Sequence, residues 1–235
     1  MMNVESLPIV LIPGLGCTPR LYAEQLPALW TFGPVTVADH RRGDSMDQIA
    51  RQILDYAPPK FALGGLSMGG YIALAIMRMA PERVQKLALL DTGARSDTPE
   101  QSERRKAQIA MAESGKLGEI ADQLWPLLVH KDRTGDTTLK QVPDEMIRVA
   151  GTEAFANQQR AIMTRPDSRP GLSDIRCPTL VLVGEGDQLT PLHLAEEMAG
   201  LIPGSHLVVV PGSGHLSTLE QPHAVTRALV EWMRL

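Results

Sequence analysis

The sequence has few cysteines, few aromatic residues and no long hydrophobic run. Only Cys17 and Cys177 among its 235 residues are cysteines, too few for a disulfide framework or a structural zinc site, so we expect a reducing, cytoplasmic setting. No stretch approaches 18 uncharged apolar residues, and no basic segment followed by an apolar one begins the chain, which predicts neither secretion nor a membrane span. The net charge is −4 without basic runs, which argues against a nucleic-acid-binding surface.

The chain contains enough apolar residues for a substantial core. Hydrophobic residues make up 43% of it, and a single domain of this length buries about 70–75% of its surface on folding. Short apolar runs rich in β-branched residues are typical of buried strands, and because most are continuously apolar they indicate a parallel sheet covered on both faces. These runs are residues 7–12, 34–38, 61–66, 84–90, 179–183 and 206–210.

Segments of helical period follow most of these predicted strands. Such alternation predicts an α/β protein with a doubly wound parallel sheet and right-handed crossovers. Prolines agree with the expected helix limits, because Pro191 and Pro222 stand where first turns begin. The predicted helices are residues 21–30, 46–56, 68–79, 192–201 and 222–233.

Residues 96–170 interrupt the alternation and predict a helical cap inserted between two parts of the core, 1–95 and 171–235. The segment contains helical patterns and no convincing strand, and it starts with Thr98 and Gln101 at the spacing of a capping box. Twelve basic and twelve acidic residues lie between Arg95 and Pro170, so the cap is neutral overall. Its other predicted helices are residues 116–129, 143–150 and 153–163.

The end of the third predicted strand carries a serine between glycines. The chain reads Gly-Gly-Leu-Ser-Met-Gly-Gly from position 64 and continues into an apolar helix, which matches the G-x-S-x-G nucleophile elbow in its required context. So tight a turn strains the serine backbone and needs small residues at Gly65 and Gly69. The turn would expose the Ser67 hydroxyl and place the Met68 amide at a helix N-terminus, where negative charge is stabilised. The alternative is a glycine-rich turn with an incidental serine.

A serine nucleophile needs a base and a group that orients the base. Asp187 follows the fifth predicted strand and His215 follows the sixth. Neighbouring parallel strands bring their C-terminal loops to one edge, so both residues can meet Ser67 there. Asp91, at the end of the fourth strand, competes with Asp187 for the role of acid, and we favour Asp187.

With these motifs in the order Ser, Asp, His, the chain resembles the α/β-hydrolase superfamily of serine esterases and lactonases. The resemblance spans the whole chain and implies a mainly parallel sheet, here of about six strands, with helices on both faces and a helical cap. It assigns the second oxyanion-hole donor, beside Met68, to the Leu15 amide, with Gly14 and Gly16 allowing close approach of the backbone. Pro13 stands where many relatives carry histidine, which leaves this donor intact.

The resemblance implies a carboxylic ester hydrolase that needs no metal or other cofactor. A small or medium uncharged acyl ester is the substrate we favour, and no nucleic-acid or membrane partner is expected; the oligomeric state stays open. Enol-lactone hydrolysis, carbon–carbon bond hydrolysis, thioester hydrolysis and ligand binding without turnover remain alternatives. An anionic substrate would need an inward-pointing arginine, for which Arg95, Arg160 and Arg165 are candidates, although we expect each to be solvated.

The cap is expected to supply an adaptable apolar pocket, because methionine fills irregular spaces. Its candidate residues are Trp125, Met111, Met146 and Met163. Cys17 lies close to the proposed oxyanion loop, but we expect it to pack rather than react. Surface or packing roles are also expected for the histidines without a motif, which are His40, His130, His193, His206 and His223.

Overall fold

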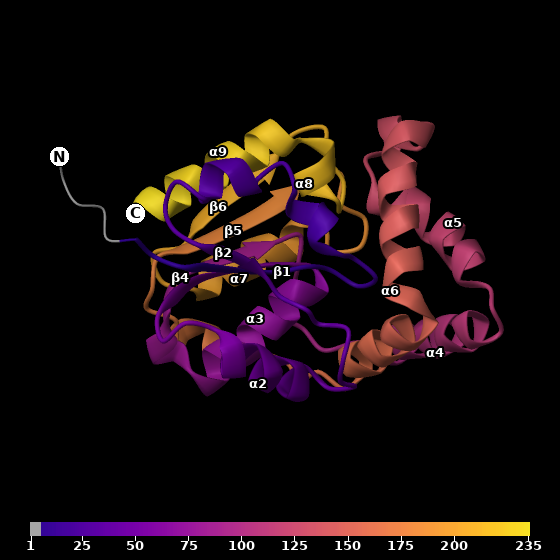
Figure 1. Ribbon diagram of the computed structural model, residues 1–235, viewed down its shortest axis with the longest axis horizontal. Helices are drawn as coiled ribbons and strands as arrows, with labels where there is room; N and C mark the ends of the chain where they lie inside the picture. The colour runs from indigo at the N-terminus through magenta and orange to yellow at the C-terminus, as the bar shows by residue number, and fades with distance from the viewer. Residues whose placement is uncertain (1–5) are drawn as a thin grey trace.

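A computed structural model, which describes residues 6–235, contains one six-stranded parallel sheet (Figure 1). The strand order is β2-β1-β3-β4-β5-β6, so the predicted doubly wound α/β fold is confirmed. The order changes direction beside β1, and the crevice at such a switch point is where α/β sheets bind ligands. The strands are β1 (Ile9–Ile12), β2 (Val35–Val37), β3 (Phe61–Leu66), β4 (Val84–Leu90), β5 (Thr179–Gly184) and β6 (His206–Val210).

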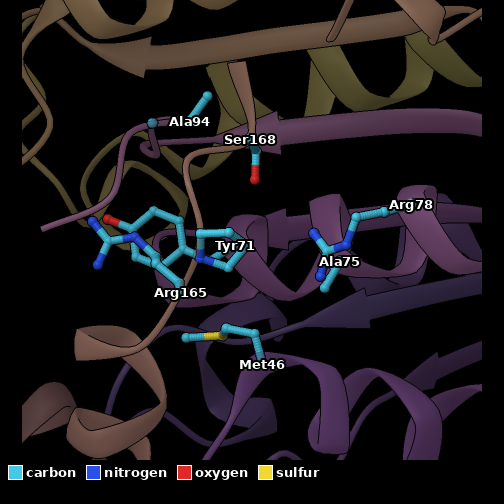
Figure 2. Close-up of a pocket in the computed structure, with 9 residues that line it drawn as sticks. Met46, Tyr71, Ala75, Arg78, Ala94, Arg165 and Ser168 are labelled. Atoms are coloured by element: carbon cyan, nitrogen blue, oxygen red, sulfur yellow. The ribbon is translucent and has the colours of Figure 1, made fainter. Parts of the chain in front are cut away.

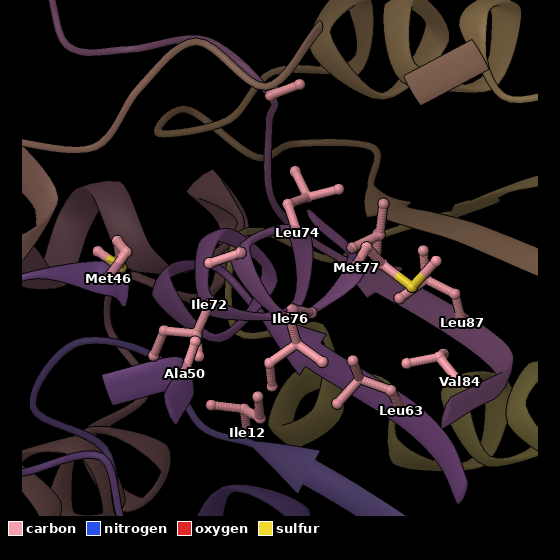
Figure 3. Packing of buried hydrophobic residues seen from close by; sticks show 14 of the residues in the cluster. Ile12, Met46, Ala50, Leu63, Ile72, Leu74, Ile76, Met77, Val84 and Leu87 are labelled. Atoms are coloured by element: carbon pink, nitrogen blue, oxygen red, sulfur yellow. The ribbon is translucent and has the colours of Figure 1, made fainter. Parts of the chain in front are cut away.

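Helices cover both faces of the sheet because successive strand residues point to opposite sides. Val10 and Ile12 of β1 pack with α2 (Met46–Tyr56), α3 (Met68–Met79) and α7 (Leu192–Leu201), in the core that Figure 3 shows. The other face of the same strand, Ile9 and Leu11, packs against a second set of elements. These are η1 (Pro19–Tyr22), α1 (Leu26–Leu29) and α9 (Pro222–Arg234).

Three helices form a cap beside the sheet, at the right of Figure 1: α4 (Pro99–Glu113), α5 (Leu117–Leu128) and α6 (Thr137–Met163). They have a small core of their own around Ile120 and Phe155. The Thr98 side chain and Gln101 form the predicted capping box at the start of α4. The remaining short helices are η2 (Pro81–Arg83), η3 (Lys131–Arg133), η4 (Arg169–Asp174) and α8 (Ser217–Glu220).

Three local predictions were wrong. The helix expected at 21–30 is split into η1 and α1, because Pro27 lacks an N–H and fits only a first turn. The two helices expected at 143–150 and 153–163 are present as the two parts of α6, which meet at a kink where Gly151 has a non-helical backbone. The first of them begins earlier than expected, at Thr137, where the Asp136 side chain accepts a hydrogen bond from the Leu139 amide. The strand β6 is not buried but largely exposed, because it lies at the sheet edge.

No helix in the described part of the chain is both long and apolar enough to cross a membrane.

Candidate active site

Ser67 lies in the turn between β3 and α3 with a strained backbone. Its φ is 55° and its ψ −116°, a region that residues other than glycine rarely adopt. A Cβ atom at Gly65 would lie 2.2 Å from the Gly69 carbonyl oxygen, and one at Gly69 would lie 2.0 Å from the Ile12 carbonyl oxygen. Both glycines are therefore required by the close approach of other backbone atoms.

Hydrogen bonds hold the Ser67 backbone in this conformation. The Ser67 amide donates to the Leu90 carbonyl oxygen at 2.9 Å, and the Thr92 hydroxyl donates to the Ser67 carbonyl oxygen at 2.8 Å. Both partners belong to β4 or the residues just after it, so the neighbouring strand fixes the turn. The Ser67 side chain borders a large cavity between the sheet edge and the cap.

Asp187 and His215 form a buried hydrogen-bonded pair. Their side chains are 0% and 4% exposed, and His215 Nδ1 lies 2.8 Å from Asp187 Oδ2. The other carboxylate oxygen accepts bonds from the Leu189 and Thr190 amides at 2.8 and 2.9 Å, and the Thr190 hydroxyl donates to Oδ2 at 2.6 Å. An ionised carboxylate only accepts hydrogen bonds, so Nδ1 carries the ring hydrogen and Nε2 is free to take a proton.

The environment of this pair favours opposite charges on its members. Burial opposes ionisation of Asp187, but the charge of His215 and the bonds from His215 and Thr190 outweigh it and lower the pKa of Asp187. Burial also opposes protonation of His215, yet the Asp187 carboxylate raises the pKa of the imidazole above its ordinary value. Asp187 therefore stabilises the protonated ring that a general base becomes.

His215 and Ser67 border the same cavity. In the described residues no hydrogen bond joins the Ser67 hydroxyl to the imidazole. Such bonds in free enzymes are often long and shorten when substrate binds. His215 and the Ser67 hydroxyl therefore border one cavity, and Asp187 is hydrogen-bonded to the Nδ1 atom of His215.

Asp91, the competing acid, lies in a different environment. It is fully buried, and its carboxyl group accepts bonds from the Gly184 amide at 2.8 Å and from the Ser217 hydroxyl. Burial, with the nearby Asp187 charge, raises the pKa of Asp91 to about 8. At neutral pH Asp91 is therefore mostly uncharged, and it is Asp187 that bonds to the His215 ring.

The loop after β1 contains Leu15, which lines the same cavity as Ser67 and His215. In the part of the chain described, neither the Leu15 amide nor the Met68 amide donates to a protein acceptor, so both are free to bind a substrate oxygen. The neighbouring Gly16 amide is occupied, because it donates to Gln158 Oε1 at 2.9 Å. Gly16 also has a φ of 67°, which favours glycine, whereas a Cβ atom at Gly14 would make only ordinary contacts, the nearest at 3.5 Å.

Two buried polar side chains that the sequence did not point to hold this loop. His40 is 1% exposed, and its Nε2 atom lies 2.9 Å from the Gly14 carbonyl oxygen. Gln158, on α6, is fully buried, and besides accepting from Gly16 it donates to the His40 carbonyl oxygen at 3.4 Å. His40 was expected to have a surface or packing role, and no local motif marks Gln158, so only the tertiary structure shows their contacts.

Glu220 links the loop that carries His215 to the cap. Its two carboxylate oxygens accept bonds from the His130 amide at 2.8 Å and the Gly214 amide at 2.6 Å. A Cβ atom at Gly214 would lie 2.4 Å from the Val129 backbone, so glycine is needed where the end of α5 crosses this loop. The cap is therefore attached to the backbone directly before His215.

The cavity between the sheet edge and the cap has a volume of about 630 Å³. Trp125 lines it, as expected, but Met111, Met146 and Met163 are not among its lining residues. Met111 packs against the cap core and Met146 is buried in the cluster on the sheet. The apolar lining comes instead from leucine, isoleucine and phenylalanine side chains of α5 and α6.

Cys17 also borders this cavity. Burial raises the pKa of its thiol to about 12, so the thiol stays protonated near neutral pH and is a poor nucleophile.

Within residues 6–235, no group of three histidine, cysteine or acidic side chains is arranged to hold a metal ion.

Comparison with known proteins identifies the family of the chain. A model of the alpha/beta hydrolase family matches residues 9–228. The chain belongs to this family. It resembles the structure of a thermophilic esterase from Thermogutta terrifontis with 33% identity and a TM-score of 0.88, over 97% of this chain and 89% of the other.

Two further relatives are less similar in sequence. The enol-lactonase structure from Burkholderia xenovorans shares the fold, with a TM-score of 0.90 and 24% identity over 100% of this chain and 94% of the other. A pimeloyl-acyl-carrier-protein methyl ester esterase from Nitrosomonas europaea is 28% identical over 76% of this chain and 73% of its own length. The family therefore covers several acyl substrates, and membership alone does not define the substrate.

Proposed function

We propose that this alpha/beta hydrolase is a serine hydrolase of carboxylic esters, including cyclic esters, with Ser67, His215 and Asp187 as its catalytic triad. The observation that carries the proposal is the strained Ser67 bordering one cavity with His215, whose ring is bonded to a buried carboxylate. The free amides of Leu15 and Met68 support it, because an acyl-transfer site needs donors for an oxyanion.

The first half of the reaction forms an acyl-enzyme. The Ser67 oxygen attacks the ester carbonyl carbon while His215 Nε2 takes the hydroxyl proton, and the carbonyl electrons move to the oxygen. The Leu15 and Met68 amides stabilise this oxyanion, an effect worth about 3–4 kcal/mol per donor. When the tetrahedral intermediate collapses, the C–O bond to the leaving group breaks and His215 returns the proton to the departing alcohol.

Water completes the cycle by the same route. His215 removes a proton from water as its oxygen attacks the acyl carbon, and the second intermediate expels the Ser67 oxygen, which regains its proton from His215. The products are a carboxylic acid and an alcohol, which remain one molecule when the substrate is a lactone.

A panel of p-nitrophenyl esters with acyl chains of two to twelve carbons tests the proposal. We expect turnover of at least one ester, and we expect Ser67→Ala to reduce kcat by about 10⁴-fold or more, because nucleophile and base act as a unit. If the wild-type protein cleaves no ester or lactone faster than Ser67→Ala does, the proposed function is wrong. Thermal unfolding of both proteins controls for misfolding of the variant.

A further inference from the structure

The cavity that Ser67 borders is rich in positive charge. Four arginines line it, one of which, Arg95, pairs with Glu197, and among the described lining residues Asp144 is the one acidic side chain. Asp144 is already paired, because Lys140 Nζ lies 2.6 Å from its carboxylate. The lining arginines are Arg95, Arg104, Arg105 and Arg165.

Two of these arginines share a single carboxylate. The Asp97 side chain, which is 1% exposed, accepts from Arg105 Nε at 2.6 Å and from Arg165 Nη1 at 2.7 Å. The arginine side chains are themselves only 20% and 8% exposed. Two guanidinium groups and one carboxylate leave one positive charge without a partner, and a charge removed from water is costly unless it is paired. An anion entering the cavity would supply the missing partner.

The position of Arg165 is fixed by its neighbours. Its guanidinium lies over the Tyr71 ring, 4.2 Å from the centroid. Figure 2, a close-up of a small adjoining pocket, shows both side chains. Nε donates to the Arg95 carbonyl oxygen and Nη1 also donates to the Ile162 carbonyl oxygen. No partner for Nη2 is found in the described part of the chain. The Arg165 guanidinium is therefore held in place while its Nη2 hydrogens remain able to bind a ligand.

Arg104 adds a second positive charge on the same side of the cavity. It makes no ion pair within 4 Å in the part of the chain that the structure describes, although Glu100 lies one turn before it on α4. The lining that α4 contributes is polar throughout and includes Gln101 and Gln108, whereas α5 contributes Leu124 and Trp125. The cavity thus combines a cationic wall with an apolar one.

We propose that the cavity selects ester or lactone substrates that carry a carboxylate away from the scissile carbonyl group. Arg104, Arg105 and Arg165 bind that carboxylate, while the apolar wall from α5 accommodates the carbon chain between the charge and the ester. A planar guanidinium matches a carboxylate in shape and charge. This substrate class rests on the proposed function, and it replaces the uncharged substrate that the sequence favoured.

A matched pair of substrates tests the proposal. The monoanionic p-nitrophenyl hemiglutarate and its neutral methyl ester share the leaving group and chain length and differ in charge. We expect kcat/KM of the wild-type enzyme to be at least about 10-fold higher for the anion, mainly through KM, as for a charged hydrogen-bonded pair. Rising salt should reduce the preference.

Single substitutions locate the effect. Arg104→Gln removes an exposed side chain without breaking an ion pair, so we expect a normal fold and a loss of most of the preference for the anion over the neutral ester. Arg165→Gln should lose it too, provided its thermal unfolding is unchanged. Lys106→Gln on the same helix is the matched control, because Lys106 pairs with Glu103 and does not line the cavity; it should keep the preference.

A binding measurement tests the carboxylate site independently of ester hydrolysis. Calorimetric titration of Ser67→Ala with monomethyl glutarate and with dimethyl glutarate should give measurable binding of the anion alone. Equal binding of the two, or a preference that survives both arginine substitutions, would overturn the carboxylate site. Selective binding of the anion without turnover of any ester by the wild-type protein would overturn the proposed function and leave the anion site standing.

Discussion

Asp187 and Asp91 are buried carboxyl groups close to one another, and their hydrogen-bond partners give them different charges. Asp187 accepts four bonds, one of them from the His215 ring, and stays ionised. Asp91 accepts two and bonds neither to the imidazole nor to any cation in the described residues. Two like charges so near each other are costly, so the carboxyl group without a cation keeps its proton.

The pH dependence of activity should therefore report the Asp187–His215 pair. Because the base must be unprotonated and its pKa is raised, kcat/KM should rise with pH along a limb whose midpoint lies above the ordinary histidine value of about 6.5. Asp187→Asn should lower kcat by about 10³- to 10⁴-fold and move the residual limb to lower pH, because the charge that raises the pKa of His215 is gone. Initial rates from pH 5 to 9 measure both effects.

Asp91→Asn provides the contrast. An asparagine can accept from the Gly184 amide and donate to the Ser217 hydroxyl, so we expect kcat to fall less than about 10-fold. Since Asp91 is mostly protonated at pH 7, little charge is lost. A severe loss in Asp91→Asn together with a mild one in Asp187→Asn would transfer the role of acid to Asp91.

At the scale of elements, the oxyanion loop depends on α6 as well as on the sheet. The loop follows β1, yet its Gly16 amide is bound by Gln158 from the second half of α6 and its Gly14 carbonyl by His40 after β2. Gln158 also reaches the His40 backbone. A cap helix therefore positions the donor loop of the core, and Gln158 acts as a positioning residue for Leu15.

Gln158→Leu should uncouple this loop from α6. The substitution leaves the Gly16 amide without an acceptor, at a cost of about 1–3 kcal/mol, and frees the Leu15 amide to move. We expect kcat to fall about 10-fold with a smaller change in KM, because the oxyanion forms only after substrate has bound. The exposed Gln141→Leu on the same helix is the control. Equal changes in KM and kcat, or no change, would contradict a positioning role.

The core elements could be predicted where local chemistry defines them. The limits of α2, α3 and α7 agree with the predicted ranges, because each has clear end signals, such as the Ser45 side chain that accepts from the Gln48 amide. The exposure of β6 and the start of α6 were missed. The exposure of β6 depends on its position at the edge of the sheet, and the start of α6 depends on which residue caps the helix.

Some residues of the candidate site could be predicted from local motifs, and others could not. Ser67, Asp187 and His215 each lie in a loop after a strand, so a local motif marks them. His40 and Gln158 act through contacts between segments far apart in the chain, which no spacing reveals. The sequence wrongly suggested that cap methionines line the cavity, because helical period alone does not show which side of a cap helix faces the cavity and which side packs on its neighbours.

At the scale of the whole molecule, charge is distributed unevenly. The protein carries a net charge of −4, yet the cavity that Ser67 borders is lined by four arginines, of which Arg95 pairs with Glu197, and by one paired aspartate. Composition and the neutral cap gave no sign of this arrangement, because a count of charges does not show that Arg105 and Arg165 share one carboxylate, that of Asp97. The sheet edge supplies the reactive groups, and the cap encloses them and supplies most of the charge.

The central claim is that Ser67 is the nucleophile, and covalent trapping tests it most directly. The wild-type protein would be treated with a fluorophosphonate, followed by intact mass measurement and peptide mapping. We predict one adduct per chain on Ser67, absent in Ser67→Ala and formed more slowly in Asp187→Asn. Two results would contradict the claim: an adduct on a residue other than Ser67, or no adduct after treatment of a protein that hydrolyses esters.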